Sequence, residues 1–521
     1  MLENKIYKSI WDIADDLRNK VDSWDFKQYV LGMIFYRFIS ENIAYTFHKN
    51  EEDSNSAIQN LRYDQVDDLI AEEWREGFVK EIGYFLLPSE LFCNVYKNLG
   101  KDKTDEGEAI NLVLDRIFKK ISKFEAFDGL FTEIDFSSDK LGKDLQARIQ
   151  RMEALVRGVQ KMELSDNSTL DTFGTAYEYL MHMYATAAGK SGGEFFTPSE
   201  VSELLMEIAV FKHKRAIAII YDPACGSGSL LLKAKKILEK QQNSTDTSLY
   251  YYGQEINLTT ANLCRMNMIL HRVGYASFKI LNVDTLTTVP KENKILKDII
   301  GKCDVIVSNP PYSIKWEGKD NPVLDADDRF MPAGSLAPKN KADMAFIMHS
   351  LYFLDVDGVA SIVCFPGILY RSGSEQQIRQ YLVNNNFVDS VILLAENLFY
   401  GTSIPACILV LRKSKENKNV LFINASNECV KVVNRNKLSQ ENIKKILDTY
   451  KARKEIDSFS KVVSNEEIAN NDYNLSVGNY IFNDINEEQE INIQNLNKEL
   501  ESIVEESNKI RDQIKQIIEQ L

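Results

Sequence analysis

Residues 216–232 read AIAIIYDPACGSGSLLL, an apolar run followed by a glycine-rich turn and a second apolar run. We interpret Ala216–Tyr221 as a buried strand and the leucines from Leu230 onward as the opening of a helix. Glycines between such a strand and helix let a ligand approach the backbone beside the free N–H groups of the helix N-terminus. The stretch therefore predicts the first strand–turn–helix unit of an α/β sheet, with a ligand site at its carboxyl edge.

Short apolar runs alternate with helical stretches throughout residues 166–415, which is the pattern of a parallel α/β sheet. The predicted strands are Ala216–Tyr221, Tyr250–Gln254, Phe278–Leu281, Asp304–Val307, Val359–Cys364, Ser390–Leu394 and Cys407–Leu411. Residues 313–342 interrupt the pattern with a long stretch rich in Lys, Asp, Pro and Gly. A loop of this length beside a site is either functional, for example through a contact with a DNA strand, or disordered.

A helical pattern precedes this domain. In residues 1–165 apolar side chains recur three and four positions apart, as at Phe26, Tyr29, Val30 and Met33. We therefore expect an all-helical N-terminal domain there. Residues 416–485 are polar and weakly patterned, and for them we expect an irregular connecting region.

Residues 486–521 carry the most regular pattern of the chain. Its members are Ile493, Leu496, Leu500, Ile503, Ser507, Ile510, Ile514, Ile517 and Leu521. So narrow a stripe predicts a coiled-coil seam, which needs a partner helix to bury it. We expect a C-terminal coiled-coil helix for subunit assembly, with a partner helix inside the same chain as the alternative.

Composition restricts the class of protein. A chain of 521 residues is too long for one core, so several domains are expected. The seven cysteines and five histidines are scattered, which favours reduced thiols, a cytoplasmic location and no metal site. No stretch is long and apolar enough for a membrane span. The net charge of −14 opposes duplex DNA, so a DNA-acting chain of this kind would need a partner to supply part of its grip.

Acidic residues follow the first three predicted strands at matching places. Asp222 precedes Gly226 and Gly228, Glu255 ends the second strand, and Asp284 follows the third. A dinucleotide site would have a third glycine and would not set a carboxylate where a pyrophosphate lies. Asp222 instead suits a cationic amino group, Glu255 suits the two hydroxyls of a ribose, and Asp284 suits an adenine amino group. These strand ends together predict a pocket for a nucleoside with a cationic tail.

The fourth predicted strand, Asp304–Val307, leads into Asn309-Pro310-Pro311-Tyr312. The two prolines lack N–H groups and fix the backbone, which leaves a stiff row of acceptors beside an aromatic ring. Such a cradle suits an –NH2 group that must be held while its nitrogen attacks an electrophile. A proline-terminated strand leading into a turn is the plainer interpretation of this tetrapeptide alone.

These motifs together resemble the amino-methyltransferases that use S-adenosylmethionine (AdoMet), in the motif order of the gamma group of DNA methyltransferases. The fold implied is a Rossmann-like AdoMet-dependent methyltransferase sheet. The resemblance gives the catalytic motif as Asn309, Pro310, Pro311 and Tyr312. It gives the cofactor-binding residues as Glu194, Phe195, Phe196, Thr197, Pro198, Ser199, Asp222, Gly226, Ser227, Gly228, Ser229, Glu255 and Asp284.

Three further segments, residues 11–18, 171–180 and 397–405, resemble the modification (M) subunit of type I restriction–modification systems. Members of that family form N6-methyladenine in double-stranded DNA. The resemblance implies a specificity (S) subunit that reads the sequence, two M subunits per S, and an optional restriction (R) subunit. The acidic charge and the unpaired C-terminal seam agree with this implication.

The resemblance also implies a mechanism. The target adenine is flipped out of the duplex, at a cost of a few kcal/mol, and Tyr312 stacks on its ring. The side-chain oxygen of Asn309 and the carbonyl of Pro310 accept the two N6 hydrogens while the nitrogen attacks the methyl group. No cysteine lies in the motif as a nucleophile, which argues against methylation of cytosine C5.

Other functions stay open at this point. The tetrapeptide does not separate adenine N6 from cytosine N4, and it also serves enzymes that act on RNA bases or on a protein glutamine. A scaffold subunit without activity is the non-enzymatic alternative. The presence of all four polar strand ends, from Asp222 to Asn309, speaks against it.

Overall fold

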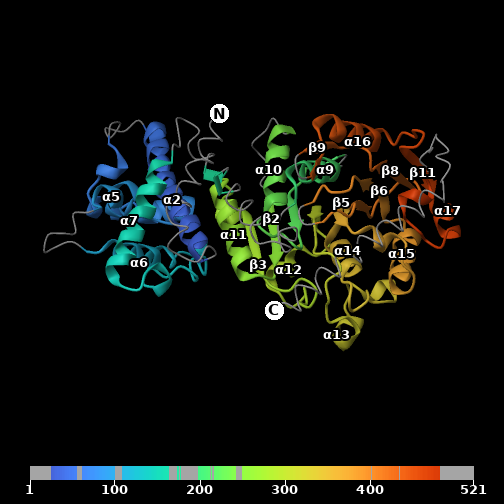
Figure 1. Ribbon diagram of the computed structural model, residues 1–521, viewed down its shortest axis with the longest axis horizontal. Coiled ribbons are helices and arrows are strands. Elements are labelled where there is room, and N and C mark those ends of the chain that lie inside the picture. The colour runs from blue at the N-terminus through green and yellow to red at the C-terminus, as the bar shows by residue number, and fades with distance from the viewer. Residues whose placement is uncertain are drawn as a thin grey trace, which may run out of the picture.

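The computed structural model describes residues 25–54, 61–99, 108–162, 173–174, 176–177, 197–211, 213, 216–241, 249–399, 402–432 and 435–481. A helical part at the N-terminal end lies beside a larger α/β part, as Figure 1 shows. The expectation of an α/β sheet preceded by helices is confirmed. The expected coiled coil of residues 486–521 lies outside the described residues.

A nine-stranded sheet forms the centre of the α/β part (Figure 1). Its strands are β1 (Ile219–Asp222), β2 (Tyr250–Glu255), β3 (Phe278–Asn282), β4 (Cys303–Ser308), β5 (Leu354–Cys364), β6 (Val388–Leu394), β7 (Cys407–Arg412), β8 (Asn419–Ala425) and β11 (Ser460–Ser464). They lie in the order β11-β8-β6-β7-β5-β4-β1-β2-β3. The five neighbouring strands β5, β4, β1, β2 and β3 are parallel to one another. Strand β7 runs antiparallel to both of its neighbours, and β11 runs antiparallel to β8.

Helices cover both faces of the sheet, and the central strands are therefore mostly apolar. All six residues of β4 are buried, with Val305 and Val307 in one core and Ile306 in the other. The first core includes α9 (Ser199–Ala209), α10 (Ser229–Gln241), α11 (Leu258–Leu270) and α16 (Gln440–Ala452). The second includes α12 (Lys294–Ile299), α14 (Asp343–Phe353), α15 (Ser374–Asn384) and α17 (Asn465–Asn470).

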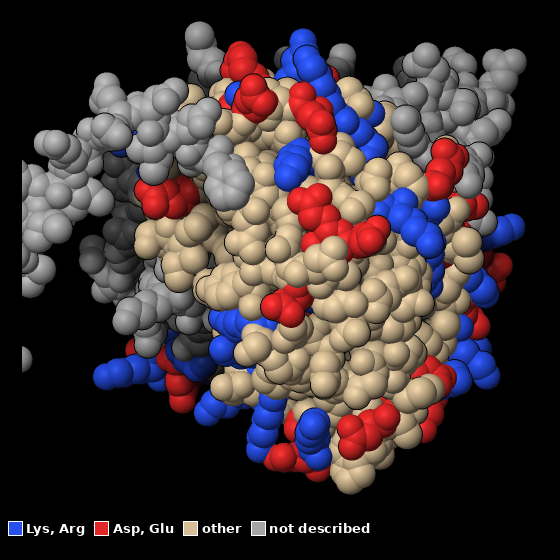
Figure 2. Space-filling model, turned by 90° about the vertical axis from the view of Figure 1, so that its right-hand side faces the viewer, with Lys and Arg blue, Asp and Glu red and all other residues tan. Residues whose placement is uncertain are grey.

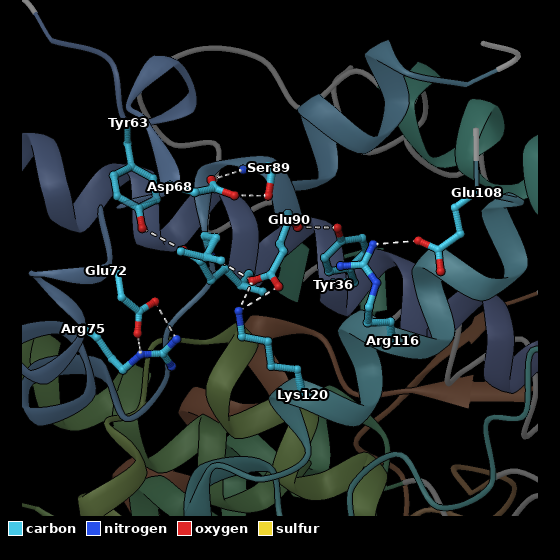
Figure 3. A network of polar contacts seen from close by, with 12 residues as sticks. Tyr36, Tyr63, Asp68, Glu72, Arg75, Ser89, Glu90, Glu108, Arg116 and Lys120 are labelled. Atoms are coloured by element: carbon cyan, nitrogen blue, oxygen red, sulfur yellow. Dashed lines mark hydrogen bonds and ion pairs between the residues drawn. The ribbon is translucent and has the colours of Figure 1, made fainter. Parts of the chain in front are cut away.

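The helical part consists of α2 (Asp25–Ser54), α3 (Asp68–Glu72), α4 (Arg75–Ile82), α5 (Phe92–Lys97), α6 (Ile110–Ile121) and α7 (Leu145–Lys161). Buried Glu90 joins two of these helices, one through its carboxylate and the other through its backbone carbonyl (Figure 3). It accepts hydrogen bonds at 2.7 Å from Lys120 on α6, and the Glu90 carbonyl accepts one from the hydroxyl of Tyr36 on α2. A buried charge is tolerated when it is paired in this way.

Helix α11 connects the helical part to the sheet. Arg265 donates to the Asp128 carbonyl at 2.6 Å, and Asn262 donates to the Gly129 carbonyl at 2.9 Å. The Thr259 hydroxyl donates to the Glu133 carboxylate at 2.9 Å. The helix that packs on β2 and β3 thus also carries the polar contacts with the N-terminal part.

Residues 416–485 differ from the expected irregular region. They contain β8 and β11, which extend the main sheet, the hairpin β9 (Val430–Val432) and β10 (Arg435–Lys437), and helices α16 and α17. The apolar run of β8, Val420–Ile423, is fully buried between neighbouring strands and helices. Its polar flanks hid the strand, because its formation depends on pairing with β6 and β11, which the local sequence does not reveal.

Among the helices of the described residues, none combines the length and the apolar character that crossing a membrane requires.

Candidate active site

The order of the strands reverses at β1, because the chain moves from β1 to β2 and β3 on one side and to β4 on the other. Ligands of open α/β sheets bind at such a reversal, beyond the carboxyl ends of the strands. A cavity of about 750 Å³ lies there. Its walls come from the turns after β1, β2, β3 and β4 and from residues 313–342.

The glycine turn after β1 adopts backbone conformations that favour glycine. Gly226 has φ of 52° and lines the cavity, and Gly228 has φ of 82°. A Cβ atom on Gly228 would lie 2.7 Å from the Cys264 sulfur on α11, so packing against a helix excludes a side chain there. Ser227 is buried and its carbonyl accepts from Asn267, while Ser229 begins α10.

Asp222 is fully buried at the end of β1. Its Oδ1 atom accepts hydrogen bonds from the Ala224 N–H at 3.0 Å and the Ser308 hydroxyl at 2.9 Å. Its Oδ2 atom has no hydrogen-bond partner within the described parts of the chain. Burial raises the pKa of Asp222 to about 7, against the lowering effect of these two hydrogen bonds. A cationic group at Oδ2 would restore the ionised form.

Glu255 and Asp284 both line the cavity from the neighbouring strand ends. Glu255 accepts from the Asn257 N–H at 2.8 Å, and the backbone of Gly226 also bonds to its carboxylate. Burial raises the pKa of Glu255 despite these contacts. Asp284 accepts from the Leu286 N–H at 2.9 Å, which folds the turn after β3 around its carboxylate. The three acids predicted from the strand ends are therefore brought to one edge of the sheet.

Residues 309–312 continue β4 at the same edge. Asn309 and Pro311 line the cavity, and Pro310 is buried. The hydroxyl of Tyr312 donates to Asn309 Oδ1 at 2.7 Å, and Asn309 Nδ2 donates to Thr197 Oγ1 at 3.1 Å. The carboxamide of Asn309 is thereby fixed from both ends.

Thr197 is the point at which the predicted cofactor segment meets the Asn309 motif. Pro198 and Ser199 follow it at the start of α9. The other three members of that prediction, Glu194, Phe195 and Phe196, lie outside the described residues.

Sequence reasoning missed two parts of the site. Ser308, which holds Asp222, stands directly before the Asn309 motif, and the sequence pattern assigns it no role. Residues 313–342, for which the sequence allows either a functional loop or disorder, contribute Trp316 and several charged side chains to the cavity wall. Their position directly after the Asn309 motif is the sequence feature that could have indicated a role in the site.

No group of His, Cys, Asp and Glu side chains suited to a metal ion occurs in the part of the chain that the structure describes. The sheet order, the glycine turn and the acids at successive strand ends are together those of a Rossmann-like AdoMet-dependent methyltransferase.

Comparison with known proteins narrows this class. A family model for N-6 DNA Methylase matches residues 168–489, and one for the HsdM N-terminal domain matches residues 6–159. The chain is 46% identical to the type I restriction enzyme MpnII methylase subunit of Mycoplasma pneumoniae, over 99% of this chain and 96% of that protein. It is 27% identical to the MjaIX methylase subunit of Methanocaldococcus jannaschii, over 98% and 90% of the two chains.

A solved structure agrees with these relatives. The crystal structure of the type I restriction-modification system methyltransferase subunit from Streptococcus thermophilus superposes with a TM-score of 0.80 and 34% identity. The match covers 92% of this chain and 99% of that one. The chain belongs to the methylase subunits of type I restriction enzymes, within the N6-adenine DNA methyltransferases.

Proposed function

We propose that this chain transfers a methyl group from AdoMet to N6 of a flipped-out adenine in double-stranded DNA, with the sequence read by an S subunit. The observation that carries the proposal is the Oδ2 atom of buried Asp222, which has no hydrogen-bond partner among the described residues, while the next two residues, Pro223 and Ala224, line the same cavity as Asn309. A buried carboxylate oxygen without a partner is costly, and the amino group of AdoMet would supply the missing cation.

The remaining acids fit the rest of the same cofactor. Glu255 would accept the ribose hydroxyls, and Asp284 would accept from the adenine amino group, because both carboxylates face the cavity from adjacent strand ends. Gly226, Ser227, Gly228 and Ser229 would form the close backbone approach, and the family resemblance assigns residues 194–199 to the methionine end. AdoMet, when bound, supplies an electrophilic methyl group.

Asn309 and Pro310 would hold the target amine through the Asn309 side-chain oxygen and the Pro310 carbonyl. Asn309 Oδ1 has two lone pairs, so it can accept from the adenine while it accepts from the Tyr312 hydroxyl. Withdrawing both hydrogens toward acceptors makes the nitrogen lone pair available for attack, which stabilises the charge that develops in the transition state. The ring of Tyr312 and the rigid Pro311 would stack against the flipped base.

The proposal of partner subunits is based on the net charge of the chain and on the apolar repeat of residues 486–521. Figure 2 shows Lys and Arg interspersed with Asp and Glu on one end of the molecule, and a continuous basic stripe is not seen among the described residues of that face. Because the net charge of −14 opposes binding to DNA, the S subunit would supply much of the affinity of the complex for DNA. Residues 486–521 would bind that subunit, with two M chains per S and an R subunit in the complete restriction enzyme.

For the domains, we propose a helical domain over residues 1–165 and a catalytic domain that starts at residue 166. The extension of the sheet by β8 and β11 favours a catalytic domain that continues beyond residue 415. Limited proteolysis followed by mass determination would test the division.

The test of the function uses purified chain, labelled AdoMet and unmodified genomic DNA, with and without the S subunit, followed by identification of the labelled base. We expect N6-methyladenine only when the S subunit is present. Label in cytosine, or in RNA or protein offered in the same assay, would contradict the adenine assignment. Absence of AdoMet binding would favour the scaffold alternative.

A further inference from the structure

The segment between the Asn309 motif and α14 is an ordered wall of the cavity. It includes the short turns Gly318–Asp320 and Met331–Ala333 and helix α13 (Pro322–Asp325). Its residues in the cavity wall are Ile314, Lys315, Trp316, Glu317, Asp320 and Lys339. The turn after β3 lines the same cavity with Asp284, Thr285 and Leu286, so a contact between this turn and the segment would fix the two parts of the wall relative to one another.

Arg329, within this segment, contacts the turn after β3 directly. Its guanidinium donates to the carbonyls of Thr285 at 2.7 Å and Leu286 at 2.9 Å. Both residues line the cavity and follow Asp284 in the chain. The Arg329 side chain is completely buried, and it forms a two-pronged ion pair with Asp327 at 2.9 and 2.7 Å.

A buried arginine with this many hydrogen-bond partners fixes the positions of the groups that it contacts. A guanidinium presents five N–H groups in a rigid plane, so it can hold two carbonyls and a carboxylate in fixed directions at once. A lysine at this position would retain the charge but could not meet all of these acceptors.

Arg329 also orders the polar groups beneath the cavity. It donates to Nδ1 of His349 at 3.1 Å, so Nε2 of that ring carries the hydrogen and donates to the Tyr221 hydroxyl at 2.6 Å. Burial and the neighbouring arginine keep the pKa of His349 well below its usual range, so the ring stays neutral. Tyr221 then donates to Gln254, which lines the cavity on β2.

The same arginine supports the aromatic side of the wall. Its guanidinium lies 4.8 Å from the centre of the Phe330 ring, and Phe330 packs edge-on against Trp316 at 5.4 Å. Trp316 in turn donates to the Pro338 carbonyl at 3.1 Å. One side chain therefore connects the turn after β3 with the aromatic part of residues 313–342.

We propose that Arg329 is a positioning residue for the nucleoside half of the cofactor, and that residues 313–342 serve as a wall of the AdoMet pocket. This proposal rests on the function proposed above and assigns a role to a segment outside the recognised motifs. It predicts that Arg329 affects AdoMet binding without affecting the handling of DNA.

The test compares Arg329→Lys with Arg379→Lys. Arg379 is an equally buried arginine whose guanidinium donates to the carbonyls of Ile368 and Tyr473, which do not line the cavity. AdoMet dissociation constants of the isolated chains are measured by calorimetry, and kcat and KM for AdoMet and DNA are measured with the S subunit bound. We expect Arg329→Lys to raise the Kd and KM for AdoMet about tenfold, with kcat and the KM for DNA within about twofold. Arg379→Lys should leave the AdoMet constants unchanged.

The proposal is overturned if Arg329→Lys binds AdoMet like the wild type, or if both variants weaken binding equally through a general loss of stability. A raised KM for DNA with unchanged AdoMet binding would also overturn it, in favour of a DNA-contacting segment. Asp327→Asn, which keeps the shape of the arginine's partner, provides a second variant with an expected increase in Kd of about threefold. If the wild-type chain itself does not bind AdoMet, the proposed function fails, which is a separate result.

Discussion

Asp222 is the side chain on which the proposed binding of the cofactor depends most. It is buried, it is held by Ser308, and one oxygen has no partner among the described residues. Burial raises the pKa of this carboxyl to about 7, so near neutral pH part of the free chain carries it protonated, and a cation at Oδ2 would favour the charged form. Binding of a cationic ligand should therefore be coupled to the release of a proton.

The first prediction is a pH dependence of AdoMet affinity. Because the pKa of Asp222 is about 7 in the free protein, the carboxyl is protonated below that pH and cannot pair with an amino group. We expect the Kd to rise toward about tenfold for each pH unit below 7, measured by calorimetry from about pH 8 to 5.5. Asp222→Asn should bind weakly and show a shallower pH profile, with the remainder due to Glu255, whose pKa is also raised.

The raised pKa of Asp222 also makes the stability of the folded free chain depend on pH, and this dependence has the opposite sign to that of AdoMet affinity. Relative to an unfolded carboxyl that titrates near 3.8, the raised pKa of Asp222 favours the folded free chain most at low pH, and this contribution is lost as the pH rises through about 7. Saturating AdoMet should remove the loss. An AdoMet affinity that stays constant across the range would contradict the assignment of Asp222.

The second prediction concerns the Asn309–Tyr312 pair. Asn309→Ala removes the acceptor of the target amine, so we expect kcat to fall about 10²-fold or more while the Kd for AdoMet stays near the wild-type value. Tyr312→Phe keeps the ring but removes the hydroxyl that holds Asn309 Oδ1, and about a tenfold fall in kcat is expected. Methylation by Asn309→Ala at the normal rate would exclude this residue from catalysis.

The third prediction separates two effects at Gly228. Gly228→Ala introduces both a strained backbone and a contact with Cys264, whereas Gly334→Ala has a similar positive φ with no atom within 4 Å. We expect Gly228→Ala to lower the free energy of unfolding by about 1–3 kcal/mol, which is more than the decrease for Gly334→Ala, and to weaken AdoMet binding. Thermal unfolding and calorimetry provide the comparison. Equal losses in the two variants would show that the packing against α11 has no effect.

At the scale of the element, the sequence predicted most of the sheet. The apolar runs of β1 to β7 could be recognised because strands buried on both faces have few polar residues. Ends were less certain, as for β5, which begins at Leu354 and not at Val359. The polar anchor at Arg329 could not be foreseen, because its partners lie on segments that are distant in the chain and meet only in the folded state.

The fourth prediction belongs to helix α11. Arg265→Ala removes the bonds to the Asp128 and Ala126 carbonyls, and we expect a loss of about 1–3 kcal/mol in the free energy of unfolding. Arg157→Ala, which breaks a more exposed pair with Glu153, should cost less than about 1 kcal/mol. Chemical denaturation of both variants gives the comparison. Similar values would mean that α11 does not couple the two parts of the chain.

For the molecule as a whole, the acidic net charge and the apolar repeat in the sequence of residues 486–521 favour association with partner subunits. The fifth prediction is that deletion of residues 486–521 abolishes co-purification with the S subunit and DNA methylation but leaves the Kd for AdoMet within about twofold, because the cavity lies in the described part of the chain. A deletion variant that still assembles and methylates DNA would require another surface for the S subunit. Size-exclusion chromatography of the mixed subunits measures assembly.

The pairing of β1 with β4 has a consequence for the order in which the protein matures during synthesis. Ile219 and Asp304 are hydrogen-bonded across these strands although they are 85 positions apart. Because a domain folds as a unit, β1 takes its place in the sheet only after the chain of β4 has been synthesised. Asp222 gains its hydrogen bond from Ser308 in the same step, because Ser308 ends β4. The strand that completes the surroundings of Asp222 also leads directly into Asn309, so we expect the two sides of the site to form together.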